Sequence, residues 1–314
     1  MKLTPQMLQG GAFLQIHDPS DPAEVNLFNF LKAMHADATA FKMPIFGSQT
    51  WNPGSLGDGA GETATFTVPG AAVGDFVLPS LGEDIQGMSI SAQVVAADTV
   101  DVRLQNESGG TLDLASITAR VAVLPMIRWQ AFGLCGIATW DPGSLIDAAG
   151  ESKTVTVTGA KLGDFAVAAL GVAVQGMTVS ASVTADDTVI VRLQNESGGT
   201  LDLASATVRV LVVPAATGFP LLGSATYDAP SLIDAAGASK DVIVLGAKLG
   251  DYAAASLDVS TQSILVTAAV KGDDLVTVRF QNETAGTLNL ASATLRVGVL
   301  PMATAMGLSA TFEG

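Results

Sequence analysis

The sequence has few of the residues that catalysis and metal binding most often use. It contains one cysteine, Cys135, and two histidines, His17 and His35. One cysteine cannot form a disulfide within the chain, and neither histidine lies in a metal-ligand pattern such as H-E-x-x-H. Cys135 lies among apolar residues in the run FGLCGIA, where we expect a buried, unreactive thiol. We therefore predict that the protein is not an enzyme and that it holds no metal and no cofactor.

Charge is also scarce, and most of it is negative. Charged residues make up 14% of the chain, and the net charge is −15 at pH 7. An acidic chain without a basic patch repels phosphate groups, so we expect no nucleic acid among its partners. A surface with so little charge instead indicates extensive contact with other protein.

Long hydrophobic runs are missing as well. No run approaches the ~18 apolar residues that a membrane-spanning helix needs. The opening residues MKLTPQMLQGGAFLQIHDP contain no unbroken apolar stretch and no small-residue cleavage site, so we expect no secretory signal. We expect a protein that is made in the cytoplasm of its host and has no membrane partner.

What the sequence does contain is one segment in three copies, at residues 50–125, 139–214 and 226–301. The copies begin at Thr50, Thr139 and Thr226, so they are spaced by 89 and 87 residues, and they align without a gap. The first two agree at well over half of their positions, and the third has diverged further. Tandem repeats of this length predict three similar modules.

Each copy has the residue pattern of short β-strands. In residues 65–69, 88–94, 100–105 and 117–123 of the first copy, apolar side chains alternate with polar ones, as in half-buried strands. Turn residues separate these runs, and we interpret the segment NESGGT as a hairpin loop whose glycines supply positive φ. We predict an all-β fold of three tandem β-sandwich or barrel-like modules.

The N-terminal part differs in kind from the repeats. The run DPAEVNLFNFLKAMHADATAFK begins with Asp-Pro and carries apolar residues at helical spacing, which predicts a helix at about residues 21–37. A unique apolar element beside a repeat array typically caps or attaches it. The candidate attachment residues are Phe13, Val25, Leu27, Phe28, Phe30 and Leu31. The expected organisation is an attachment segment at 1–43, modules at 44–126, 127–214 and 215–302, and a tail at 303–314.

Three aspartates and two arginines recur in every copy. The aspartates are Asp58, Asp75 and Asp98, then Asp147, Asp164 and Asp187, then Asp234, Asp251 and Asp274. Paired carboxylates can hydrolyse glycosides, but each of these lies beside Gly or Ala, so we predict bonds to local backbone amides in turns. The arginines are Arg103, Arg192 and Arg279 on one strand, and Arg120, Arg209 and Arg296 on another. If these strands pair, cross-strand or intersubunit ion pairs are expected.

One aromatic residue recurs at the opening of each copy: Trp51, Trp140 and Tyr227. Aromatic rings on a surface can stack against a sugar, which makes these three residues candidates for ligand binding. The alternative is a ring that fills the core of its module, and the sequence favours that alternative.

The segment LGDF…VRLQNESGGTLDLAS…RV resembles repeated β-modules of virion structural proteins of tailed bacteriophages, and the resemblance covers residues 50–301. It implies an elongated, often trimeric protein that an N-terminal element fixes to the virion. We therefore expect a capsid decoration or head-fibre protein, a homotrimer bound through residues 1–43 to the major capsid protein or another virion protein. The alternative is a tail fibre that recognises a glycan on the host surface.

Overall fold

Alternating apolar and polar residues form six antiparallel strands in the first repeat. The computed structural model describes residues 44–125, 134–215 and 219–302. The first module contains β1 (Ile45–Trp51), β2 (Gly61–Thr67), β3 (Phe76–Leu81), β4 (Ser89–Ala96), β5 (Thr99–Gln105) and β6 (Ile117–Leu124). These strands form two three-stranded sheets, ordered β1-β6-β3 and β2-β5-β4. The predicted N-terminal helix and its attachment residues lie outside the described residues.

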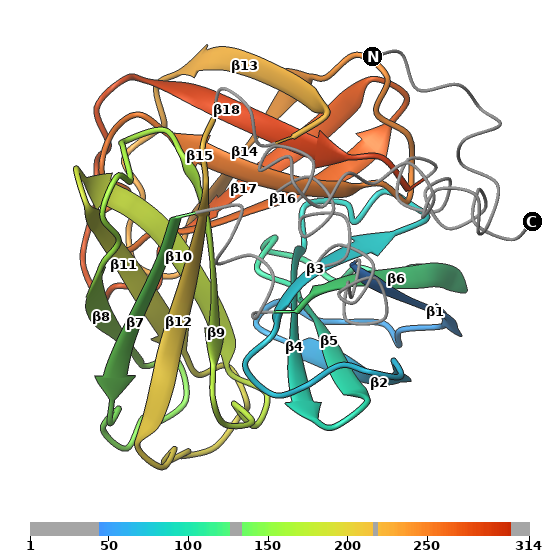
Figure 1. Cartoon of the computed structure of the whole chain (residues 1–314). Helices are drawn as coiled ribbons and strands as arrows, with labels where there is room; N and C mark the ends of the chain where they lie inside the picture. Colours follow the sequence, from blue (N-terminus) through green and yellow to red (C-terminus); the bar gives the residue numbers. More distant parts are fainter. Residues whose placement is uncertain (1–43, 126–133, 216–218, 303–314) are drawn as a thin grey trace, which may run out of the picture. The chain divides into compact units, whose positions relative to one another are not determined.

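The second and third repeats fold in the same way (Figure 1). The second module contains β7 (Leu134–Trp140), β8 (Gly150–Thr156), β9 (Phe165–Leu170), β10 (Thr178–Ala185), β11 (Thr188–Gln194) and β12 (Ala206–Val213). The third module contains β13 (Leu221–Tyr227), β14 (Gly237–Ile243), β15 (Tyr252–Leu257), β16 (Leu265–Gly272), β17 (Leu275–Gln281) and β18 (Ala293–Leu300). The prediction of an all-β chain with three repeated β-sandwich modules is confirmed.

The core of each module lies between its two sheets. On β5, the side chains of Val100, Val102 and Leu104 are fully buried, whereas Arg103 between them points to the other face of the sheet. The equivalent alternation on β11 and β17 builds the other two cores. A period of two along a strand therefore separates a module's own core from the face that it presents outward.

The segment NESGGT does not form a hairpin. It follows β5, which belongs to one sheet, and it leads to β6, which belongs to the other. The hairpin of each module instead joins β4 to β5, where Asp98 has a φ of 59° at the turn. The predicted positive φ does occur in the loop, at Gly109 and Gly198. Ala285 holds the equivalent position in the third module.

The three modules belong to one compact unit, Pro44–Gly314, and share an additional core. This shared cluster joins buried residues of all three modules: Phe76, Leu78, Ala122, Leu124, Ala169, Leu211 and Tyr252. The rings of Phe46 and Tyr252, from the first and third modules, have centroids 6.1 Å apart. Apolar burial therefore joins the modules to one another as well as filling each one.

Candidate functional site

The recurring aspartates all accept hydrogen bonds from backbone amides, but the predicted local bond is found only for Asp75 and its equivalents. In the first module, Asp58 Oδ1 accepts a hydrogen bond from the Gly109 amide at 2.8 Å, and Asp75 Oδ2 accepts one from the Ala72 amide at 3.0 Å. Asp98 Oδ1 accepts a hydrogen bond from the Gly70 amide. The six equivalent aspartates of the other modules make the same bonds. The bonds of Asp75, Asp164 and Asp251 join residues three positions apart. Those of Asp58 and Asp98, like those of their equivalents, reach amides 51 and 28 positions away, so they connect separate loops.

A buried asparagine organises each loop after the strands β5, β11 and β17. The Asn195 side-chain amide donates hydrogen bonds to the carbonyl oxygens of Leu145 and Gly199, at 2.8 and 2.7 Å, and its Oδ1 accepts one from the Ser197 amide. Asn106 and Asn282 do the same, and all three are fully buried. The sequence analysis missed this role. The repeated QNES and QNET motif was the available signal.

Arginines on the strands β5, β11 and β17 join each module to the next. Each guanidinium donates to the backbone carbonyl of a glutamate in the neighbouring module. The three bonds run from Arg103 Nη2 to Glu196 O at 2.6 Å, from Arg192 Nη2 to Glu283 O, and from Arg279 Nη2 to Glu107 O at 2.5 Å. The first module thus binds the second, the second binds the third, and the third binds the first. This ring of contacts closes within one chain.

The second set of arginines, on the strands β6, β12 and β18, also reaches neighbouring modules. The guanidinium of Arg209 lies so close to Gly74 that a Cβ there would overlap it, and Arg296 and Arg120 stand in the same relation to Gly163 and Gly250. The two arginine-bearing strands do not pair, because β5 and β6 belong to different sheets, so the condition for cross-strand ion pairs between them is not met. The sequence of a single repeat does not show which residues of the neighbouring modules these arginines contact.

Two serine hydroxyls extend these contacts between modules. Ser80 Oγ donates to the carbonyl oxygen of Gly250 at 2.8 Å, and Ser256 Oγ donates to that of Gly163 at 2.6 Å. Both serines are buried. Ala169 takes the equivalent place in the second module and has no hydroxyl to donate. The recurring polar residues therefore serve the joints between modules.

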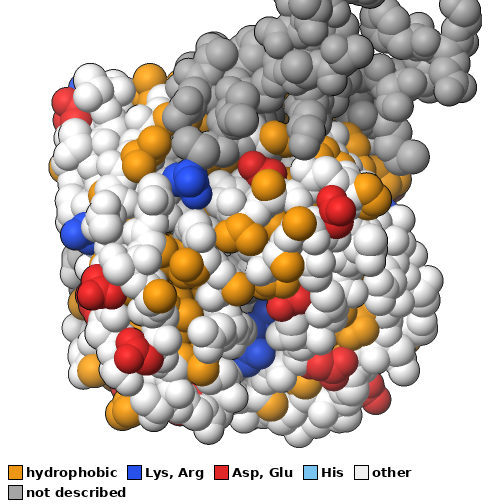
Figure 2. Space-filling view, turned by 60° about the horizontal axis from the view of Figure 1, so that its bottom comes forward, with side chains coloured by type: hydrophobic (Ala, Val, Ile, Leu, Met, Phe, Trp, Pro, Cys, Tyr) orange, Lys and Arg blue, Asp and Glu red, His pale blue; other side chains and the backbone are white. Residues whose placement is uncertain are grey.

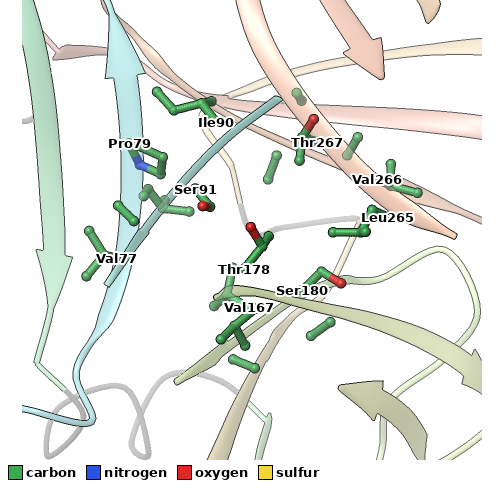
Figure 3. A pocket seen from close by; sticks show the side chains of 18 of the residues that line it. Val77, Pro79, Ile90, Ser91, Val167, Thr178, Ser180, Leu265, Val266 and Thr267 are labelled. Atoms are coloured by element: carbon green, nitrogen blue, oxygen red, sulfur yellow. The ribbon is translucent and has the colours of Figure 1, made fainter. Parts of the chain in front are cut away.

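A small cavity lies where the three modules meet (Figure 3). Its volume is about 120 Å³, and it is lined by equivalent strands of every module, including the hydroxyl-bearing Ser91, Ser180 and Thr267. The strands β3 and β4, and their equivalents, are the edge strands of their sheets. Their convergence covers edges that would otherwise be open to pairing with another chain. Ligand pockets usually have volumes of roughly 300–1,000 Å³, so this cavity does not suit a drug-sized molecule.

The recurring aromatic residues lie in the module cores. Trp51 and Trp140 are buried, and their Nε1 atoms each donate to a glutamate of the same module, Glu62 or Glu151, at 3.1 Å. Tyr227 is half-buried, with its ring centroid 5.0 Å from that of Phe280. The two indole faces are therefore closed to a ligand in this structure. Ligand stacking by these three residues stays a prediction.

The remaining candidates are a thiol and a metal site. Cys135 is half-buried beside the shared cluster, and burial raises the pKa of its thiol. Among the described residues, no group of three or more His, Cys, Asp or Glu side chains is arranged to hold a metal ion. Within that part of the chain there is also no helix long and apolar enough to cross a membrane.

The chain matches no protein-family model, and comparisons with curated proteins and with solved structures give no match.

Proposed function

We propose that the protein is a non-enzymatic structural component of a bacteriophage virion, a capsid decoration or head-fibre protein. It is attached to the capsid by residues 1–43, and its β-modules face outward. The observation that carries this proposal is the use of the recurring polar side chains, which hold turns and join modules. A chain whose repeated residues serve architecture suits a structural role.

The closed ring of modules supports capsid decoration in particular. Three similar modules around one centre present three similar surfaces, which suits a site where three equivalent subunits of a shell meet. The predicted homotrimer stays a prediction, because it concerns contacts between chains. A homotrimer would need surfaces other than those that join the modules within one chain.

The outer surface has little charge, in keeping with contact to other protein. Much of the face shown in Figure 2 carries neither acidic nor basic side chains. Small groups of hydrophobic side chains lie between the few charged ones. Large apolar side chains are exposed on the second and third modules, including Ile146, Ile233, Ile243 and Leu245. Single exposed apolar residues are common, so these support the proposal only together with the low charge.

Deletion of residues 1–43 tests the proposal. The full-length protein and the deletion variant are each mixed with capsids of the encoding phage from which the protein has been removed, and co-sedimentation is measured. We expect the full-length protein to bind and the deletion variant to stay in solution, with the β-sheet circular-dichroism signal and the Tm of the modules retained. A variant lacking residues 303–314 is the control and should bind.

Retained binding by the deletion variant would contradict attachment through residues 1–43. Failure of the full-length protein to bind any part of the head, together with binding to host glycans, would favour the tail-fibre alternative.

A further inference from the structure

One arginine, one glutamine and one glutamate of each module form a polar unit at the joint to the next module. In the second module, Arg192 Nη2 donates to Gln194 Oε1, and Gln194 Nε2 donates to Glu196 Oε1 at 2.8 Å. The first module repeats this with Arg103, Gln105 and Glu107, and the third with Arg279, Gln281 and Glu283. We call these nine residues the junction ring.

The junction ring connects the modules through its glutamates. The backbone carbonyl oxygen of each glutamate accepts the hydrogen bond from the arginine of the neighbouring module, while its carboxylate is held by the glutamine of its own module. A movement of any of these glutamates therefore changes a contact between modules. Glu283 is the most enclosed, with 9% of its surface exposed.

Negative charge accumulates around the ring. Each glutamate faces an aspartate of its own module, which is Asp58, Asp147 or Asp234. The cations in the same surroundings are the guanidiniums of Arg103, Arg192 and Arg279. The three aspartates are exposed, whereas the glutamates are half-buried or buried. Full ionisation therefore sets six carboxylates against three guanidiniums and leaves an excess of negative charge beside the enclosed glutamates. Such an excess disfavours the ionised form of the most buried acids.

The pKa values of the glutamates follow this arrangement. Burial, with repulsion from Glu196, Glu107 and Asp234, raises the pKa of Glu283 to about 7, although the hydrogen bond from Gln281 opposes the shift. Burial also raises the pKa of Glu107 and of Glu196 above the ordinary glutamate value. Burial lowers the pKa of the three arginines, which nevertheless stay charged near neutral pH.

We propose that the junction ring is a pH-responsive joint, in which protonation of its glutamates tightens the contacts between modules and ionisation loosens them. Protonation removes the burial cost of the charges and the repulsion among carboxylates on three different modules. It also removes the smaller attraction between these carboxylates and the arginines, while the arginine–carbonyl bonds need no carboxylate. The joint is therefore tight in mildly acidic solution and looser above neutral pH.

The direction of the effect follows from proton binding. A glutamate whose pKa is higher in the folded chain than in the unfolded chain binds more protons when folded. The stability that it contributes is fully present below its unfolded pKa and is lost as the pH rises through its folded pKa, which for Glu283 is about 7. The thermal midpoint of the protein should therefore fall between pH 5.5 and pH 8.0.

The test compares the full-length protein with the triple variant Glu107→Gln, Glu196→Gln and Glu283→Gln at constant ionic strength. We expect the wild-type Tm to fall by about 5 °C from pH 5.5 to pH 8.0, and the triple variant to lose most of that dependence. The variant should also have the higher Tm at pH 8.0. If the triple variant does not fold, the single variant Glu283→Gln takes its place in the comparison, and it should also show a smaller fall in Tm than the wild type.

Loss of net charge alone could also change the Tm, so the control removes three exposed carboxylates by Glu83→Gln, Asp113→Asn and Asp202→Asn. This control should retain the wild-type pH dependence. A direct measurement is the carbon-13 titration of the Glu283 carboxyl group, which should have its midpoint near pH 7. A midpoint at the ordinary glutamate value, or a triple variant with the same pH dependence as the control, would overturn the proposal.

Discussion

At the residue scale, the most fully used polar side chain is the asparagine of the QNES and QNET loops. Its amide satisfies two backbone carbonyls, and its oxygen accepts a backbone amide, all within a fully buried site. A buried polar group without a partner is costly, so the loop conformation depends on this one residue. The neighbouring glutamate and the arginine that binds its carbonyl oxygen depend on the same loop.

Replacement of this asparagine should destabilise the fold. Asn195→Ala leaves the carbonyl oxygens of Leu145 and Gly199 without that donor, and we expect the free energy of unfolding to fall by about 2 kcal/mol. Chemical denaturation measures the change. Asn289→Ala, at an exposed position, should alter the free energy of unfolding by less than about 0.5 kcal/mol. Equal effects of the two substitutions would show that the buried hydrogen bonds contribute little.

Only some of the roles of individual residues could be predicted from the sequence. The bond of Asp75 could be assigned to a turn because Asp beside Gly or Ala is a local signal, whereas Asp58 and Asp98 bond amides 51 and 28 positions away. The targets of the arginines could not be assigned, because Arg103 binds a residue 93 positions away and Arg279 one 172 positions away. Alternation along a strand shows that such a side chain points away from the core of its own module. It does not show which surface of another module the side chain contacts.

At the element scale, the strands β3, β9 and β15 are elements that alternation along the chain could not predict. Their sequences FVLPSL, FAVAAL and YAAASL do not alternate between apolar and polar residues. Both faces of these strands are covered, one by the module's own core and the other by neighbouring modules, so no polar face is needed. The strands with one polar face were those that alternation predicted.

Close approach of the two sheets fixes a glycine in the first strand of each module. A Cβ added to Gly136 on β7 would lie 2.6 Å from the backbone oxygen of Thr156 on β8. We expect Gly136→Ala to lower the free energy of unfolding by about 2 kcal/mol, because a backbone atom cannot move aside without separating the sheets. Thermal denaturation measures this, and Gly199→Ala is the control because a Cβ there meets nothing within 4 Å. A Gly136→Ala variant as stable as the control would contradict the close approach.

At the scale of the whole molecule, the modules are joined in a ring that the repeat pattern alone could not predict. Repeats that contact only their immediate neighbours form an open array. Here the third module also binds the first, through Arg279 and the carbonyl oxygen of Glu107, and through Ser80 and that of Gly250. The number and fold of the modules were predictable from sequence, whereas their closure depends on contacts between surfaces that no local pattern describes.

Closure of the ring means that the three modules stabilise one another. Differential scanning calorimetry of the full-length protein measures whether they do. If the modules unfold as one unit, the ratio of calorimetric to van't Hoff enthalpy is about 1, and a single transition is observed. Three separate transitions, or a ratio of about 3, would contradict the claim, because the modules would then unfold independently.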